Sequence, residues 1–137
     1  MGLNPVKTNS SSALLAEPHH GLAEGVRSLL GTTFEAVVMV ADEVSLIEAA
    51  QRICPALAVI DLYLVRTDVQ GFMHRLKGRC PGLRVIFLSA HDDATVVQAV
   101  LAAGADGFVA RTRIAADLLP AVDAVLRGER YGLVPEA

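Results

Sequence analysis

Five short apolar runs alternate along this chain with segments whose apolar residues recur at helical spacing. The runs cover residues 13–16, 36–40, 56–60, 83–88 and 107–110. A continuous apolar run is typical of a strand buried on both faces, as happens when helices cover both sides of a parallel sheet. Because parallel crossovers are right-handed, the alternation predicts a doubly wound α/β sandwich of five strand–helix units, (βα)5, with strand order 2-1-3-4-5.

Helix positions follow from the same pattern. Apolar residues at helical spacing fill the stretches 22–30, 44–53, 72–76, 96–101 and 114–126. Asp42 can cap the second of these helices, and Asp92 or Asp93 can cap the fourth. Pro120 conflicts with the fifth, because a proline inside a helix costs about 3 kcal/mol. That helix is therefore expected to bend at Pro120 or to begin its regular part later.

Length and charge limit the function. A chain of 137 residues fits one domain, predicted here over residues 13–128, and the polar residues 1–12 are predicted to be a disordered tail. The net charge of −3 argues against this segment binding nucleic acid on its own. The sequence also lacks an apolar stretch long enough to span a membrane, so a cytoplasmic protein is expected.

Two cysteines stand at similar places in the repeat. Cys54 precedes Pro55 and Cys80 precedes Pro81, each where a helix is predicted to end and a buried strand to begin. They could form a disulfide or a redox pair. Separate apolar thiols in a reducing cytosol are the preferred interpretation.

Polar residues stand at the carboxyl ends of four of the predicted strands. They are Glu17, Asp61, Ser89 and Arg111. In an open parallel sheet this edge is where ligands bind. A carboxylate can attack phosphorus, a divalent cation bound by oxygens can neutralise the incoming charge, and a hydroxyl and a guanidinium can hold phosphoryl oxygens. The set therefore suits the handling of a phosphoryl group.

Several stretches together resemble one family. The chain is similar, over residues 12–136, to the receiver domain of two-component response regulators, most of all to the NarL/FixJ (LuxR-type) subgroup. The matching stretches are LLAEPH at 14–19, EGVRSLL at 24–30, VIDL at 59–62, LSAHDD at 88–93, AAGADGF at 102–108 and LRGERY at 126–131.

The resemblance implies roles for individual residues. Asp61 matches the phosphoacceptor, which takes phosphate from a histidine kinase. Ser89 matches the hydroxyl residue that turns toward the new phosphoryl group, and Phe108 matches the aromatic switch residue, although a packed core ring is an equal alternative. Arg111 stands where the family has a lysine.

A Mg²⁺ site is also implied, with Glu17, Asp61 and the backbone carbonyl of Tyr63 as ligands. The family has a second acidic residue where this chain has Pro18, which cannot bind a metal ion. His19 lies beside Glu17, and together with the adjacent histidine it leaves a transition-metal site open as an alternative to a loop position.

Three departures fall around the same crevice. Pro18 removes a metal ligand, Arg111 is larger than lysine and differently shaped, and the loop at Val65 lacks the family's Pro-Gly turn. The hypothesis is therefore a divergent receiver in which Mg²⁺ binds weakly or is lost and phosphorylation is impaired.

Three functions compete. The first is a receiver that is phosphorylated at Asp61 and controls transcription through a DNA-binding output domain absent from this chain, with residues 129–137 as the start of the linker. The second is a pseudo-receiver that acts as an interaction or dimerisation module without phosphorylation. The third is an enzyme such as an aspartyl phosphatase, which is disfavoured because Tyr63 stands where such enzymes carry a general acid. A symmetric homodimer could form in either of the first two cases.

Overall fold

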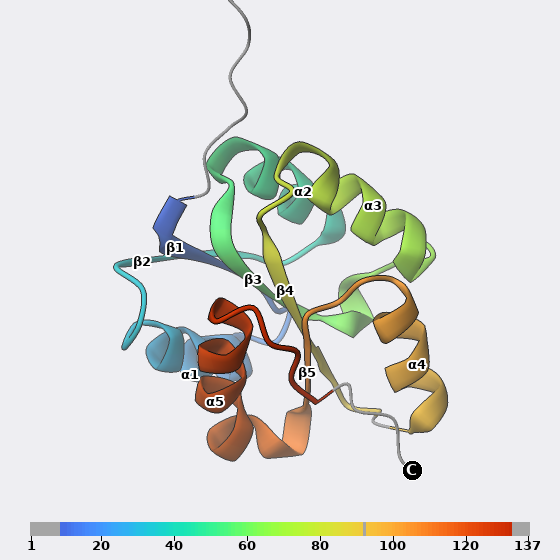
Figure 1. Ribbon diagram of the computed structural model, residues 1–137. Coiled ribbons are helices and arrows are strands. Elements are labelled where there is room, and N and C mark those ends of the chain that lie inside the picture. The colour runs from blue at the N-terminus through green and yellow to red at the C-terminus, as the bar shows by residue number, and fades with distance from the viewer. Residues whose placement is uncertain (1–8, 92, 133–137) are drawn as a thin grey trace, which may run out of the picture.

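A five-stranded parallel sheet forms the centre of the molecule (Figure 1). The computed structural model describes residues 9–91 and 93–132. The strand order is β2-β1-β3-β4-β5, which confirms the predicted doubly wound fold. The strands are β1 (Asn9–Ala16), β2 (Ala36–Val40), β3 (Pro55–Asp61), β4 (Arg84–Ser89) and β5 (Gly107–Ala110).

Helices cover both faces of the sheet. The α-helices are α1 (His20–Leu30), α2 (Glu43–Ile53), α3 (Val69–Arg79), α4 (Ala94–Ala102) and α5 (Ile114–Leu126), and short 3-10 turns follow β3 (η1, Leu62–Leu64) and β5 (η2, Arg111–Arg113). Figure 1 shows α1 and α5 on one face and α2, α3 and α4 on the other. None of the helices in the described part of the chain is long and apolar enough to cross a membrane.

Two apolar cores separate the sheet from its helices. Leu14 packs in the core under α2, α3 and α4, whereas its neighbour Leu15 packs in the core under α1 and α5. Ala58 and Val59 of β3 divide in the same way. Successive side chains of a strand point to opposite faces, so a continuous apolar run supplies both cores at once.

The helix starts agree with the caps expected from the sequence. The Asp42 side chain accepts a hydrogen bond from the backbone N–H of Ser45 at 2.8 Å, and Asp93 accepts one from Val96 at 3.0 Å. Asp92, the other candidate cap of α4, lies outside the described residues. Each cap satisfies a backbone donor that the first helical turn leaves free.

The amino-terminal strand begins earlier than predicted. Residues 9–12 were expected to belong to a disordered tail, but β1 starts at Asn9, and Ser12 is aligned with Ala36 of β2. Strand pairing satisfies the backbone of this polar segment, which hydropathy alone does not indicate. Residues 1–8 of the predicted tail lie outside the described residues.

Pro120 lies inside α5, which runs unbroken from Ile114 to Leu126. The predicted late start is therefore wrong, whereas the alternative, a bend at Pro120, stays a prediction. Pro120 and Ala116 are both exposed, so the carbonyl that loses its intrahelical donor faces the solvent side of the helix. Water can satisfy it there.

The chain after α5 returns to the edge of the sheet. The backbone N–H of Phe108 donates to the carbonyl of Tyr131 at 2.9 Å, and the N–H of Tyr131 donates to the carbonyl of Asp106 at 3.1 Å. The described part of the predicted linker therefore covers the outer edge of β5. Residues 133–137 lie outside the described range.

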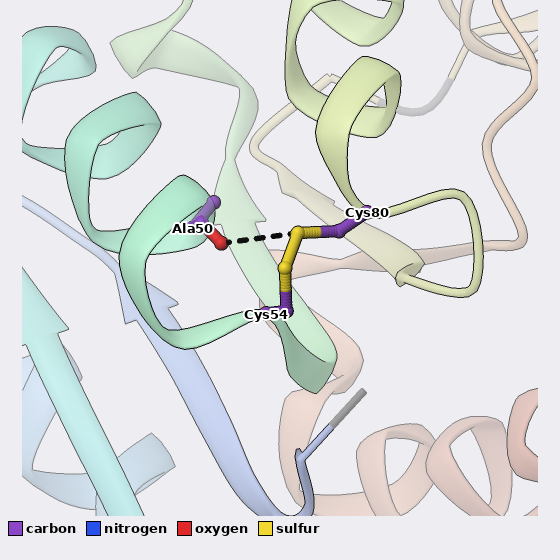
Figure 2. Close-up of a disulfide and its surroundings, with 3 residues drawn as sticks. All are labelled: Ala50, Cys54 and Cys80. Atoms are coloured by element: carbon purple, nitrogen blue, oxygen red, sulfur yellow. Dashed lines mark hydrogen bonds between the residues drawn. A yellow bond between two sulfur atoms is a disulfide. The ribbon is translucent and has the colours of Figure 1, made fainter. Parts of the chain in front are cut away.

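The two cysteines are joined by a disulfide (Figure 2). The expectation of separate thiols is therefore wrong for this structure. β3 and β4 are neighbours, so the residues that precede them meet at the amino-terminal edge of the sheet, with 5.6 Å between the Cα atoms of Cys54 and Cys80. The Cys80 sulfur also lies 3.4 Å from the carbonyl oxygen of Ala50, where a reduced thiol would find an acceptor.

Candidate functional site

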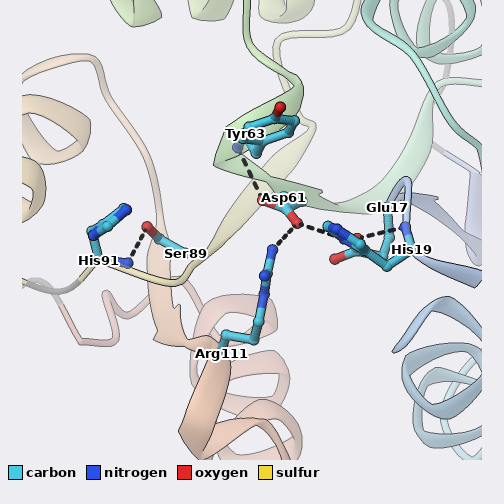
Figure 3. Close-up of polar contacts among 7 residues, drawn as sticks. All are labelled: Glu17, His19, Asp61, Tyr63, Ser89, His91 and Arg111. Carbon is cyan, nitrogen blue, oxygen red and sulfur yellow. Dashed lines mark hydrogen bonds and ion pairs between the residues drawn. The ribbon is translucent and has the colours of Figure 1, made fainter. Parts of the chain in front are cut away.

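A cleft of about 500 Å³ opens at the carboxyl edge of the sheet. Asp61, Ser89 and Arg111 line it, and they come from the ends of β3, β4 and β5. Glu17, directly after β1, lies next to Asp61 (Figure 3). The structure thus brings together the four strand-end residues that the sequence singled out, while their roles stay predictions.

The same local turn follows three of the strands. The side chains of Glu17, Asp61 and Ser89 each accept a hydrogen bond from the backbone N–H two residues later, at 3.0, 2.9 and 3.0 Å respectively. A short polar side chain that binds the backbone two residues on holds the chain in a turn. These turns hold the polar side chains over the sheet edge.

Asp61 is almost fully buried and carries an ion pair. Its side chain is 1% exposed, and one oxygen, Oδ2, accepts a hydrogen bond from Nη2 of Arg111 at 2.5 Å. The other oxygen, Oδ1, accepts the N–H of Tyr63. Burying a lone carboxylate is costly, so Arg111 supplies the charge that makes this position tolerable.

Glu17 is buried beside Asp61 and is only partly satisfied. Its Oε2 accepts the backbone N–H of His19 and lies 2.9 Å from Nδ1 of the His19 ring. Its Oε1 is buried and has no hydrogen-bond partner among the described residues. Burial raises the pKa of the Glu17 carboxyl, the His19 backbone hydrogen bond offsets part of this rise, and the adjacent Asp61 raises the pKa again.

A pH-dependent stability difference follows for Glu17→Gln in the presence of a chelator. The unfolded carboxyl loses its proton near 4.5, whereas the folded one keeps it to higher pH. Wild-type stability therefore falls as pH rises from that value through the raised pKa, and glutamine, which does not titrate, escapes this loss. We expect urea unfolding to show that the free energy of unfolding of the variant rises relative to that of wild type between about pH 4 and pH 7. A difference that stays constant over this range would contradict the prediction.

A divalent cation fits this end of the sheet in part. Glu17 and Asp61 offer two carboxylates, and the unpaired Oε1 of Glu17 lacks the partner that a cation would supply. Mg²⁺ is commonly held by one or two carboxylates and waters. Pro18 adds no ligand, and Arg111 already places a positive charge on Asp61. The donor set therefore suits a divalent cation, but the guanidinium of Arg111 would compete with that cation for Asp61.

Two other predicted residues lie away from the cleft opening. Phe108 is 5% exposed and packs in the core under α2, α3 and α4. Val65 ends the turn η1, donates its N–H to the carbonyl of Leu62 and packs partly against the same core. The loop at Val65, which lacks a Pro-Gly turn, is thus anchored by an apolar contact with the core.

No role was predicted for His91, which also lines the cleft. Its backbone N–H donates to Oγ of Ser89, as described above (Figure 3). The available signal was the spacing of two residues from a strand-end hydroxyl, which favours a turn that returns the chain over the site.

Comparisons with known proteins agree with this geometry. The family model described as the response regulator receiver domain matches residues 13–123. The transcriptional regulatory protein DegU of Brevibacillus brevis is 28% identical over 128 residues, which cover 92% of this chain and 54% of that protein. The transcriptional activator protein ExaE of Pseudomonas putida is 34% identical over 116 residues, 82% of this chain and 50% of that protein. This chain thus spans about half the length of these relatives.

Solved structures share the fold at lower identity. A LuxR-family two-component response regulator from Aurantimonas superposes with a TM-score of 0.78 at 22% identity, over 90% of this chain and 89% of that one. The signal receiver domain of the response regulator NarL from Mycobacterium tuberculosis gives 0.77 at 22% identity, over 88% and 98% of the two chains.

Proposed function

Because this chain belongs to the response regulator receiver family, we propose that it accepts a phosphoryl group on Asp61. The observation that carries the proposal is the place of Asp61, a buried carboxylate at the floor of a cleft also lined by Ser89 and Arg111. The phosphoryl donor would be a histidine kinase, as the family implies.

The reaction is an in-line transfer. An oxygen of Asp61 attacks phosphorus, the bond from phosphorus to the histidine nitrogen of the donor breaks, and that nitrogen keeps the electron pair. Glu17, Asp61 and the carbonyl of Tyr63 would hold Mg²⁺, which when bound neutralises phosphoryl charge. Arg111 remains beside the product, where its guanidinium can hold phosphoryl oxygens.

Transfer is expected to be slow in this chain. Arg111 binds Oδ2 of Asp61 and Tyr63 binds Oδ1, so both oxygens of the nucleophile are already engaged. Pro18 contributes no carboxylate to the metal. Both features raise the barrier relative to a receiver with a second acid and a lysine.

Phosphorylation of Asp61 would shift the population of the domain from one conformation to another. Ser89, which now accepts the backbone N–H of His91, would turn so that its hydroxyl donates to a phosphoryl oxygen, and Phe108 would follow into the space that Ser89 leaves. Phe108 is bonded through its backbone N–H to Tyr131, so a change at β5 would reach the segment that leads out of the domain.

We further propose that the chain is the receiver part of a cytoplasmic transcription regulator that binds DNA through another domain. The names of DegU and ExaE support this, since both are transcriptional proteins and the match to this chain covers only about half of each. The faces of α1 and α5, or of α4, β5 and α5, could form a homodimer in either state.

Incubation with acetyl phosphate and Mg²⁺ tests the proposal. We expect intact mass spectrometry to find one added phosphoryl group on wild type and none on Asp61→Asn. The exposed Asp123 gives a matched control, since Asp123→Asn should be labelled like wild type. If wild type stays unlabelled after prolonged incubation, or if Asp61→Asn is labelled equally, the proposal fails. The unlabelled result would favour the phosphorylation-independent pseudo-receiver.

A further inference from the structure

Three side chains of different kinds meet beside the cleft. Glu17, His19 and Asp61 each offer one ligand atom, and these atoms all lie within 4.8 Å of one another (Figure 3). Ala16 pairs with Ile60 in the sheet, so the residues after them, Glu17 and Asp61, are neighbours. His19 precedes α1, and its backbone is tied to Glu17 by a hydrogen bond. The backbone therefore holds the three groups together.

One oxygen of this cluster is buried without a hydrogen-bond partner among the residues that the structure describes. Glu17 is 4% exposed, and its Oε1 has no hydrogen-bond donor within the described part of the chain. A buried carboxylate oxygen without a partner costs free energy, and native proteins rarely leave one unsatisfied. A bound cation would satisfy Oε1 and would also neutralise the pair of carboxylates.

The chemistry of the donors selects the cation. Mg²⁺ prefers oxygen ligands, whereas an imidazole nitrogen suits first-row transition metals such as Zn²⁺. Pro18 stands where another acid would have given an all-oxygen set, and His19 brings a nitrogen next to Glu17 instead. We propose that Glu17, His19 and Asp61 form a site for a divalent transition-metal ion, Zn²⁺ or a similar ion, through two carboxylates and Nδ1 of His19.

The present contacts of these three side chains allow a metal ion to bind. The side chain of His19 is 57% exposed, so an ion can approach its ring from solvent. Nδ1 donates to Glu17 in one tautomer and offers a lone pair in the other. Arg111 is the competitor, because it holds Oδ2 of Asp61, the oxygen that lies 4.0 Å from Nδ1 of His19.

Binding can be measured without any phosphoryl donor, so this proposal stands or fails separately from phosphorylation at Asp61. Metal-free protein is titrated with Zn²⁺ and with Mg²⁺ by calorimetry, and with Co²⁺ by its visible absorption. Wild type should bind one Zn²⁺ or Co²⁺ per chain. His19→Ala should weaken Zn²⁺ binding about tenfold or more and leave the weaker Mg²⁺ binding unchanged, because only the transition metal uses the ring.

Two further variants complete the test. Glu17→Gln should weaken the binding of both ions, since both use this carboxylate. The exposed neighbour His20 provides the control, and His20→Ala should bind Zn²⁺ like wild type. The proposal is overturned if His19→Ala retains wild-type Zn²⁺ affinity, which would place the ion elsewhere, or if wild type binds no Zn²⁺ or Co²⁺.

Discussion

Replacing Arg111 with lysine is expected to accelerate the phosphorylation of Asp61 by acetyl phosphate about tenfold. Nη2 of Arg111 lies 2.5 Å from Oδ2 of Asp61, so the guanidinium engages the nucleophile before any donor arrives. A hydrogen bond to a charged group contributes roughly 1.5–3 kcal/mol, and about 1.4 kcal/mol removed from a barrier is a tenfold rate change. Lysine keeps the charge on a more flexible and compact group, which can leave the carboxylate and bind the phosphoryl oxygens.

The rate of mass increase at saturating Mg²⁺ measures this effect. Arg113 is the matched control, since it is exposed, belongs to the same turn after β5 and pairs with Asp117 rather than with Asp61. Arg113→Lys should therefore leave the rate unchanged. A rate for Arg111→Lys equal to or below that of wild type would show that the guanidinium assists the transfer rather than hindering it.

Much of the fold follows from local sequence because the central strands β3 and β4 are buried on both faces, although the edge strand β2 is partly exposed. All seven residues of β3 are buried, and a short apolar run such as 56–60 is typical of a strand in the middle of a covered sheet. The caps at Asp42 and Asp93 depend only on a side chain and the next helical turn. The start of β1 at Asn9 depends instead on pairing with β3, a partner far along the chain, so hydropathy missed it.

The site was predictable in its location but not in its contacts. A parallel sheet brings strand ends together, so the grouping of Asp61, Ser89 and Arg111 follows from topology. Whether Arg111 points at Asp61 or at solvent depends on side-chain conformation, which the sequence pattern does not contain. The unpaired Oε1 of Glu17 is likewise a product of burial and of the turn at His19.

The disulfide also depends on residues that are far apart in the sequence. We expect its loss to have the largest effect on stability. Reduction of the bond between Cys54 and Cys80 is expected to lower the free energy of unfolding by roughly 3 kcal/mol and the melting temperature by about 10 °C. The bond closes a loop across 26 positions of sequence, and opening it returns conformational entropy to the unfolded chain.

Urea unfolding of the oxidised and reduced protein measures this loss, with the oxidation state checked by thiol alkylation. Both cysteines are buried, at 0% and 1% exposure, so the folded protein should resist reduction until it opens. A Cys54→Ala/Cys80→Ala variant separates the crosslink from packing, because it should unfold identically with and without reductant. Equal stability of oxidised and reduced wild type would mean that the thiols pack as well as the disulfide, with the Cys80 thiol donating to the carbonyl of Ala50.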